Sequence, residues 1–270
     1  MKSIIDAPCG RLLGTQDNGV MLFRNIPYAS APIGDLRFAP PQVMAAWSGT
    51  RYAALAGFVP PQGKSRLAAI TGGEVETPQS EDCLTLELTR AAGTGSSRPV
   101  LVWIHGGGFV GGSGSHPWYS AAALARRGDV AVVNLNFRQG VLGHLCLPGV
   151  SPGNLALLDI VMALRWVRLN IAAFGGDPDC VTVFGQSSGA SAIAALLAMP
   201  AAEGGQRVSD TRAGKPTGNT IYRPAGQRLR ADSCSTIGSL LKSTCCPGRI
   251  HPLLQSARTG CKRAGIRADH

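Results

Sequence analysis

Short apolar runs, separated by glycine, proline and charged residues, predict the strands of this chain. Residues 100–104, 130–136 and 181–184 are apolar almost throughout, which is typical of strands buried on both faces of a sheet. Residues 84–88 alternate and predict a shorter strand. Residues 11–26 predict a hairpin, because Asp-Asn-Gly at positions 17–19 supplies turn residues between two apolar runs.

Apolar residues at helical spacing predict helices between these strands. The clearest covers residues 155–174 and ends at Gly175-Gly176, a good helix C-terminus. Residues 118–127 and the Ala- and Leu-rich residues 188–199 predict two more, whereas the proline-rich residues 27–61 predict a long surface segment. Strands that alternate with helices indicate an α/β fold: a mainly parallel sheet, helices on both faces, and the hairpin at one edge.

The chain changes character after Pro200. Residues 204–270 show no sustained period and are dense in Arg, Ser, Thr, Gly and Cys. Of the net charge of +10, residues 1–203 carry +1 (14 basic and 13 acidic side chains) and residues 204–270 carry +9 (12 and 3). The arginines of this tail are scattered around a single aromatic residue, Tyr222, so no nucleic-acid partner is expected. A basic tail of low hydrophobicity is more simply disordered.

Membrane-span and secretory patterns and the spacing of cysteines indicate the cellular location and the metal content to expect. No apolar run approaches the roughly 18 residues of a membrane span. Residues 1–14 lack the apolar segment and cleavage site of a secretory signal. We expect a cytoplasmic protein, or a secreted one if the N-terminus is incomplete. The eight cysteines include no CxxC pair, so no zinc site is expected, and their wide spacing favours free thiols.

Residues 185–189, Gly-Gln-Ser-Ser-Gly, place Ser187 between a predicted strand and a predicted helix. A GxSxG nucleophile elbow requires this context: small residues at positions 185 and 189 let the chain turn sharply, and Ser187 then projects at the helix N-terminus. The motif alone is weak evidence, and a solvated serine in a strand–helix turn is the alternative.

A second motif, His-Gly-Gly-Gly-Phe at residues 105–109, follows the predicted strand at 100–104. Acyl transfer passes through an oxyanion that needs preorganised backbone N–H donors, and glycine lets the backbone approach a substrate closely. The two motifs together predict a serine hydrolase whose oxyanion hole is formed by the N–H groups of Gly107, Gly108 and Ser188. This chemistry requires no metal and no cofactor.

The same glycines raise a competing interpretation. Gly106, Gly108 and Gly111 have the spacing of a dinucleotide-binding fingerprint. That fingerprint must open a helix, whereas residues 112–117 are loop. The nearest acid, Asp129, precedes its strand instead of ending it. We therefore reject this interpretation.

Histidines upstream of Ser187 are poor candidates for the catalytic base. In elbow enzymes the acid and the histidine follow the serine along the chain. We therefore expect His105 to hold the glycine loop, and His116 and His144 to lie in loop or packing positions.

Further segments, in order along residues 9–203, carry a resemblance to a known family. They are residues 23–29, 36–38, 80–86, 99–109, 136–140, 153–159, 163–167, 170–171 and 174–178, which lead into the GxSxG motif. The sequence resembles the type-B carboxylesterase/lipase family, in particular bacterial p-nitrobenzyl-type esterases. The resemblance implies an α/β-hydrolase fold, small-molecule carboxylic esters as substrates, Ser187 as nucleophile, and Gly107, Gly108 and Ser188 as oxyanion hole.

Some positions depart from the family pattern. Gln186 and Ser188 stand where the family usually has Glu and Ala, which is a mild change because residue 188 contributes its N–H. Pro60 stands where disulfide-bonded members have the partner of the cysteine at position 83, so the resemblance implies that Cys83 is unpaired.

The resemblance stops near residue 203, before the family's triad acid and histidine. Acids and histidines of the tail follow no predicted strand, so both roles stay unassigned; these residues are Asp210, Asp232, Asp269, His251 and His270. We expect a truncated hydrolase over residues 1–203, with residues 204–270 read out of frame or otherwise unrelated. Truncation there would leave the strand at 181–184 as a bare apolar edge.

Two functions follow from this. The first is a carboxylesterase, impaired without a recognisable acid and histidine. The second is a catalytically inactive member of the family that acts by binding. Retention of Ser187 favours damage to an esterase over recruitment to adhesion.

Overall fold

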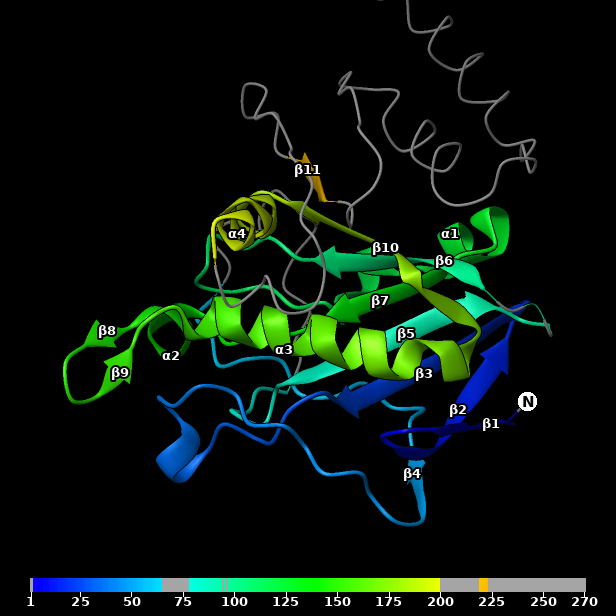
Figure 1. Ribbon diagram of the computed structural model, residues 1–270, viewed down its shortest axis with the longest axis horizontal. Coiled ribbons are helices and arrows are strands. Elements are labelled where there is room, and N and C mark those ends of the chain that lie inside the picture. Colours follow the sequence, from blue (N-terminus) through cyan, green and yellow to red (C-terminus); the bar gives the residue numbers. More distant parts are fainter. Residues whose placement is uncertain (1, 65–77, 94, 96, 200–218, 223–270) are drawn as a thin grey trace, which may run out of the picture. The chain divides into compact units, whose positions relative to one another are not determined.

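The computed structural model describes residues 2–64, 78–93, 95, 97–199 and 219–222, all within a unit that spans residues 1–228 (Figure 1). A nine-stranded sheet organises the described part of this unit, in the order β1-β2-β3-β5-β7-β6-β10-β11, with β4 beside β2. The strands are β1 (Lys2–Ala7), β2 (Gly10–Asp17), β3 (Val20–Pro27), β4 (Thr50–Tyr52), β5 (Thr85–Ala91), β6 (Arg98–Ile104), β7 (Ala131–Leu135), β10 (Gly176–Gln186) and β11 (Asn219–Tyr222).

Parallel pairing is concentrated in the middle of the sheet. β6 pairs in parallel with both β7 and β10, while β1, β2, β3 and β5 form an antiparallel series that joins β7. The predicted α/β-hydrolase fold, with antiparallel strands at one edge, is confirmed. The predicted hairpin is β2–β3: Asp17 pairs with Val20 across a two-residue turn in which Asn18 (φ 46°) and Gly19 (φ 74°) adopt left-handed backbone.

The three predicted helices are present with shifted ends, whereas the short helices Gly34–Leu36 and Gly140–His144 were not predicted. The described helices are η1 (Gly34–Leu36), η2 (Pro117–Tyr119), α1 (Ala122–Gly128), α2 (Gly140–His144), α3 (Leu155–Asn170), η3 (Ile171–Phe174) and α4 (Ser188–Leu197), and a small hairpin of β8 (Cys146–Leu147) and β9 (Ser151–Pro152) follows α2. The predicted helix at 155–174 is confirmed as α3 continued by η3, and Gly175 (φ 76°) ends it. The predicted helix at 118–127 is shorter, because Pro117 opens a 3₁₀ turn and α1 begins only at Ala122.

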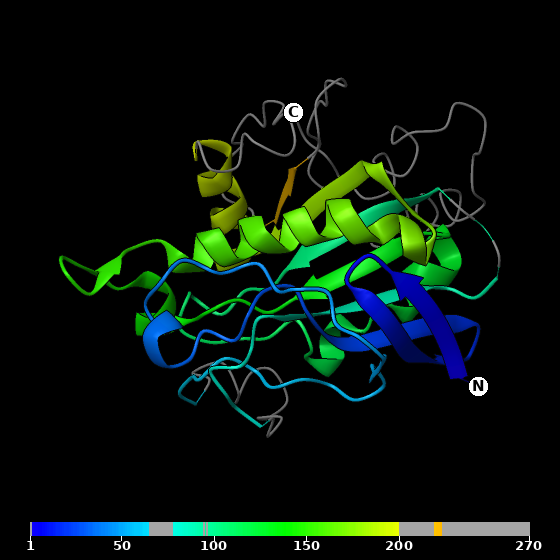
Figure 2. The same cartoon turned by 60° about the horizontal axis from the view of Figure 1, so that its bottom comes forward.

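Helices cover both faces of the sheet. The side chains of β6 alternate, and those that point to one face join residues of α3 and α4 in the main hydrophobic core, as Val102 does. Trp103 points to the other face, where its ring lies 5.1 Å from that of Tyr119 beside α1. Figures 1 and 2 show α3 crossing the first of these faces. The expectation that residues 100–104 are buried on both faces is wrong in part, since Leu101 and Trp103 are only half-buried.

Three strands of the large sheet were not predicted, and neither was the small hairpin of β8 and β9. β1 pairs with β2, and β4 adds a short parallel pairing inside the proline-rich segment. β11 pairs antiparallel with the last four residues of β10, from Val183 to Gln186. The expected bare edge at residues 181–184 is therefore wrong at the positions that β11 covers.

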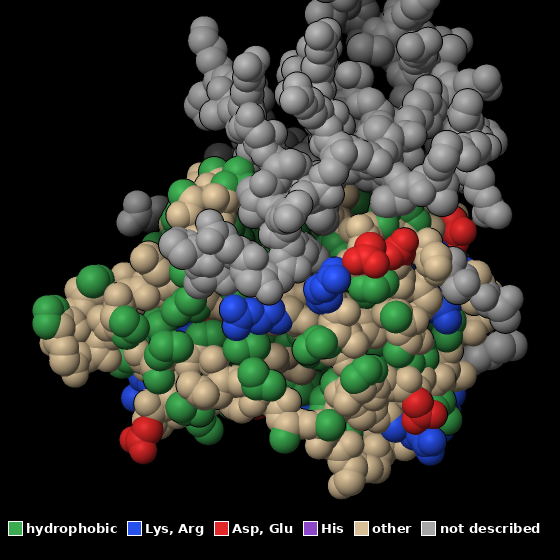
Figure 3. Space-filling model, viewed as in Figure 1, with side chains coloured by type: hydrophobic (Ala, Val, Ile, Leu, Met, Phe, Trp, Pro, Cys, Tyr) green, Lys and Arg blue, Asp and Glu red, His purple; other side chains and the backbone are tan. Residues whose placement is uncertain are grey.

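Membrane spans and surface charge can be compared with the sequence-based expectations. No helix in the described ranges is long and apolar enough to cross a bilayer. On the face in Figure 3, the lysine and arginine side chains of the described residues stand in small separate groups.

Cys9, Cys83 and Cys146 are free, which confirms the expectation for Cys83. Cys180 is disulfide-bonded, so the expectation of free thiols fails there.

Candidate active site

The carboxyl ends of β7, β6 and β10 bring three chain segments together. Register places Ile104 of β6 beside Gly185 of β10 on one side and Leu135 of β7 on the other. Since parallel strands end at the same edge, the residues that follow them meet there, which is where ligands bind in open α/β sheets. Both sequence motifs, at residues 105–109 and 185–189, therefore lie at one edge of the sheet.

Ser187 occupies the turn between β10 and α4. Its backbone has φ 54° and ψ −124°, a conformation that a non-glycine residue adopts at a cost of about 1–3 kcal/mol. The residue is exposed, and its carbonyl accepts the N–H of Ser191 at 3.1 Å, so α4 begins immediately behind it. The predicted sharp turn is present, and it displays the Ser187 side chain at the helix N-terminus.

The two glycines of GxSxG are required by close packing. A Cβ on Gly189 would collide with the carbonyl oxygen of Ile104 and lie 2.6 Å from that of His105. A Cβ on Gly185 would lie 2.8 Å from the Ile104 oxygen. The end of β6 thus presses directly against the first turn of α4, and only glycine leaves the space.

The glycine loop after β6 lies against the serine. A Cβ on Gly106 would be 3.3 Å from the Cβ of Ser187 and 2.9 Å from the carbonyl oxygen of Gln186. Gly107 and Gly108 have φ values of 131° and 64°, which favour glycine. The loop is thereby placed next to the position that an acyl group bound to Ser187 would occupy.

Backbone donors are free at this point. Within the described part of the chain, the N–H groups of Gly107 and Gly108 donate to no other residue, while the Gly107 carbonyl accepts the N–H of Val110 at 3.2 Å. Ser188 is the first residue of α4, so its N–H has no acceptor inside the helix. The structure therefore leaves available the three N–H groups that were predicted to bind an oxyanion.

His105 supports the glycine loop, as expected. It is fully buried, its Nδ1 lies 2.7 Å from the Gly106 carbonyl oxygen, and its ring stacks on Phe137 at 4.5 Å. Burial lowers the pKa of His105 to about 4, so the imidazole is neutral at pH 7 and Nδ1–H donates to Gly106. A neutral, buried ring that is committed to the loop is not placed to act as a base.

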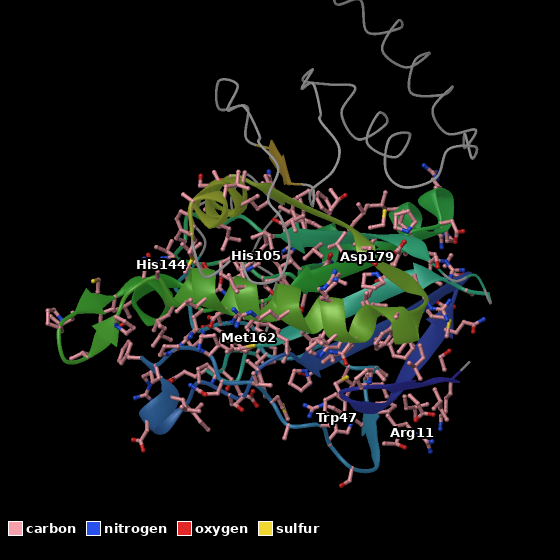
Figure 4. All side chains as sticks on the ribbon, in the orientation of Figure 1. Arg11, Trp47, His105, His144, Met162 and Asp179 are labelled. Atoms are coloured by element: carbon pink, nitrogen blue, oxygen red, sulfur yellow. The ribbon has the colours of Figure 1, made fainter. Side chains whose placement is uncertain are left out.

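The other histidines of the described residues also have local roles. His116 caps η2, where its Nδ1 accepts the N–H of Trp118 at 3.3 Å, and His144 packs edge-on against Phe109 at 5.0 Å. In the view of Figure 4, His105 and His144 lie near α4, and Asp179 lies farther away, in the first half of β10. The Ser187 hydroxyl bonds to no imidazole or carboxylate among the residues that the structure covers; the acids and histidines of the tail, Asp210, Asp232, Asp269, His251 and His270, lie outside them.

Asn136 and Gln62 support the site and were not predicted. The Asn136 side chain accepts the hydroxyl of Ser113 at 3.0 Å and the N–H of Gly114 at 2.8 Å, and so fixes the chain beyond the glycine loop. Gln62 bonds to Gly112 of the loop itself. Asn136 belongs to a segment that matched the family pattern, and Gln62 follows the position at residue 60 where the chain departs from that pattern, but its contact with Gly112 was not predicted.

A buried ion pair holds the segment that follows β7. Arg138 Nη2 and Nε lie 2.6 and 2.8 Å from the carboxylate oxygens of Asp159 in α3, and both side chains are at most 2% exposed. Arg138 also donates to the backbone carbonyls of Arg37 and Ala39. The pair ties the region behind the glycine loop to α3 and to the segment after β3.

Comparison with known proteins shows which protein family this chain matches. The model of the carboxylesterase family matches residues 1–228. The para-nitrobenzyl esterase of Bacillus subtilis (strain 168) is 46% identical over 204 residues, which are 74% of this chain and 41% of that protein. The phenmedipham hydrolase of Pseudarthrobacter oxydans is 45% identical over 202 residues, with the same coverage of 74% and 41%.

Solved structures agree with the sequence comparison. A PNB esterase structure matches with a TM-score of 0.71 at 46% identity, covering 77% of this chain and 43% of that one. A thermophilic PNB esterase matches with a TM-score of 0.71 at 44% identity and the same coverage. The chain spans less than half the length of these relatives.

Proposed function

The chain belongs to the carboxylesterase family, and from that premise we propose that it carries the nucleophile and oxyanion-binding part of a serine esterase site. Ser187 is the nucleophile, and the N–H groups of Gly107, Gly108 and Ser188 form the oxyanion hole. Small-molecule carboxylic esters are the substrates. The observation that carries the proposal is the backbone of Ser187, which keeps a strained conformation (φ 54°, ψ −124°) beside a glycine loop with free donors.

The reaction would proceed by acyl transfer. Ser187 Oγ attacks the acyl carbon while a histidine takes the hydroxyl proton. The oxyanion that forms accepts hydrogen bonds from the three N–H groups. Collapse of the tetrahedral intermediate releases the alcohol, which takes the proton from the histidine. Water then hydrolyses the acyl-enzyme and restores Ser187. Each oxyanion donor contributes about 2.7–4 kcal/mol to such a transition state.

The histidine and the acid of this scheme are unassigned in the chain. A serine hydroxyl without an adjacent base is a weak nucleophile. No described imidazole bonds to Ser187, and this observation favours the second candidate function, a catalytically inactive member of the family.

Covalent labelling separates the two functions. The 270-residue protein is incubated with a fluorophosphonate, the modified peptide is identified by mass spectrometry, and hydrolysis of p-nitrophenyl acetate is measured in parallel. Labelling at Ser187, lost in Ser187→Ala and kept in Ser191→Ala, supports an activated nucleophile; Ser191 is a matched control because it is also exposed and lies one helical turn away. A folded protein that takes no label and shows no turnover contradicts catalysis and favours the inactive member.

The domain division and the location of the protein are further proposals. We propose a hydrolase portion over residues 1–203, a basic tail over residues 204–270, and a cytoplasmic location. Limited proteolysis of the full chain tests the division. Cleavage that begins directly after residue 203 supports it, and protection through residue 228, where the family match ends, contradicts it.

A further inference from the structure

The side chain of Gln62 forms a two-point contact with the glycine loop. Its Oε1 accepts the N–H of Gly112 at 2.7 Å, and its Nε2 donates to the carbonyl oxygen of the same residue at 3.1 Å. Nε2 also donates to the Pro60 carbonyl at 3.0 Å. Both ends of the amide are therefore engaged on one backbone unit, which fixes its orientation as well as its position.

Gln62 is itself anchored from the other side. Its backbone N–H donates to the Gln79 side chain at 2.8 Å. Val59 and Gln79 form a β-bridge, with hydrogen bonds from Val59 to Pro78 and from Ser80 to Val59 of 3.0 and 3.1 Å. The segment that carries Gln62 is thus held independently of the glycine loop, and it can act as a fixed support.

Gly112 belongs to the returning limb of the loop. A Cβ on Gly107 would collide with the carbonyl oxygen of Gly111, and a Cβ on Gly112 would collide with that of Gly106 and lie 2.7 Å from His105 Nδ1. The outgoing and returning limbs are thus packed backbone to backbone. Since glycines have no side chains to hold them in place, a displacement of Gly112 would pass directly to the N–H groups at 107 and 108.

We propose that Gln62 is a positioning residue of the oxyanion hole: its amide clamps Gly112 and thereby fixes the direction of the Gly107 and Gly108 N–H groups. The inference rests on the proposed function in that those groups bind the oxyanion. Asn136 holds the next part of the chain, but it is only 1% exposed, so its replacement would disturb the core. Gln62 is half-buried, and its replacement tests the clamp with less damage.

The test compares Gln62→Met with Gln42→Met in the full chain. Methionine keeps the length of the side chain and removes the amide. Gln42 is a matched control because it is exposed and its amide donates to the nearby Pro40 carbonyl at 3.3 Å. The measurements are kcat and KM for p-nitrophenyl butyrate, the inhibition constant of a trifluoromethyl ketone, and the urea midpoint of unfolding.

We expect Gln62→Met to lower kcat about 10- to 100-fold, because donors that are misplaced by a fraction of an ångström lose transition-state binding. The inhibition constant should rise by a similar factor, since the hemiketal oxyanion of a ketone occupies the same hole, while KM changes less than about twofold. Gln42→Met should match the wild type. An unchanged kcat with an unchanged inhibition constant would overturn the proposal. A rise in KM that accompanies a lower urea midpoint would also overturn it.

Hydrogen exchange makes the clamp testable even if the proposed function fails. If the wild-type chain takes no fluorophosphonate and shows no turnover, esterase activity is refuted separately. Exchange of the amides in residues 105–113, followed by mass spectrometry, then decides on the clamp. Faster exchange in Gln62→Met than in Gln42→Met supports it, and equal exchange in the two variants overturns it.

Discussion

The strained backbone at Ser187 makes an unusual prediction about stability. Ser187→Ala and Ser187→Gly both remove the proposed nucleophile, so neither should take a fluorophosphonate label. They differ in the backbone, because alanine keeps a Cβ at φ 54° and ψ −124° whereas glycine adopts this conformation freely. We therefore expect the glycine variant to be the more stable of the two.

The size of the difference follows from two opposing effects. Relief of strain at this position favours glycine by about 1–3 kcal/mol. The greater freedom of glycine in the unfolded chain favours alanine by about 0.4–1 kcal/mol. The difference between the two ranges is about 0–2.6 kcal/mol in favour of glycine, and its midpoint of about 1.3 kcal/mol corresponds to a rise in Tm of a few degrees for a domain of this size.

Urea unfolding followed by tryptophan fluorescence measures the difference directly. Ser191 provides the control, because it lies inside α4 and is exposed. There the order should reverse, with alanine more stable than glycine by about 1 kcal/mol. If alanine is as stable as glycine at position 187, or if both positions give the same order, the strained elbow does not exist in solution and the reasoning fails.

Two further predictions concern buried charges. Because burial lowers the pKa of His105 from 6.5 to about 4, the unfolded chain binds its proton first as pH falls. Above pH 6.5, His105 therefore does not change the free energy of unfolding. Near pH 4, it lowers the free energy of unfolding by about 3 kcal/mol. Urea midpoints between pH 4.5 and 7.5 should depend less on pH in His105→Gln, and identical slopes would contradict this. Asp159→Asn leaves the 2%-exposed Arg138 without its counter-charge and should cost about 3–5 kcal/mol, measured in the same way; the double variant Arg138→Met with Asp159→Leu should recover part of it, and a loss below about 1 kcal/mol would refute an essential pair.

Predictability depended on how far apart the interacting residues lie in the chain. The β2–β3 turn, α3 and the elbow at Ser187 were predicted because each depends on neighbouring residues: turn glycines, apolar periodicity, and small residues around a serine. The pairings of β4 and β11 were missed, because short segments form strands there only by meeting a distant partner.

The sequence by itself determined the α/β architecture, the position of the proposed nucleophile and the glycines that could form an oxyanion hole, since local periodicity and the steric freedom of glycine are properties of a few consecutive residues. Only the tertiary structure showed that Gly189 must be glycine to clear Ile104, and that His105 is buried and neutral. It alone brought Gln62 to Gly112, 50 residues along the chain. Such contacts depend on how the strands and loops pack together, and no local pattern encodes them.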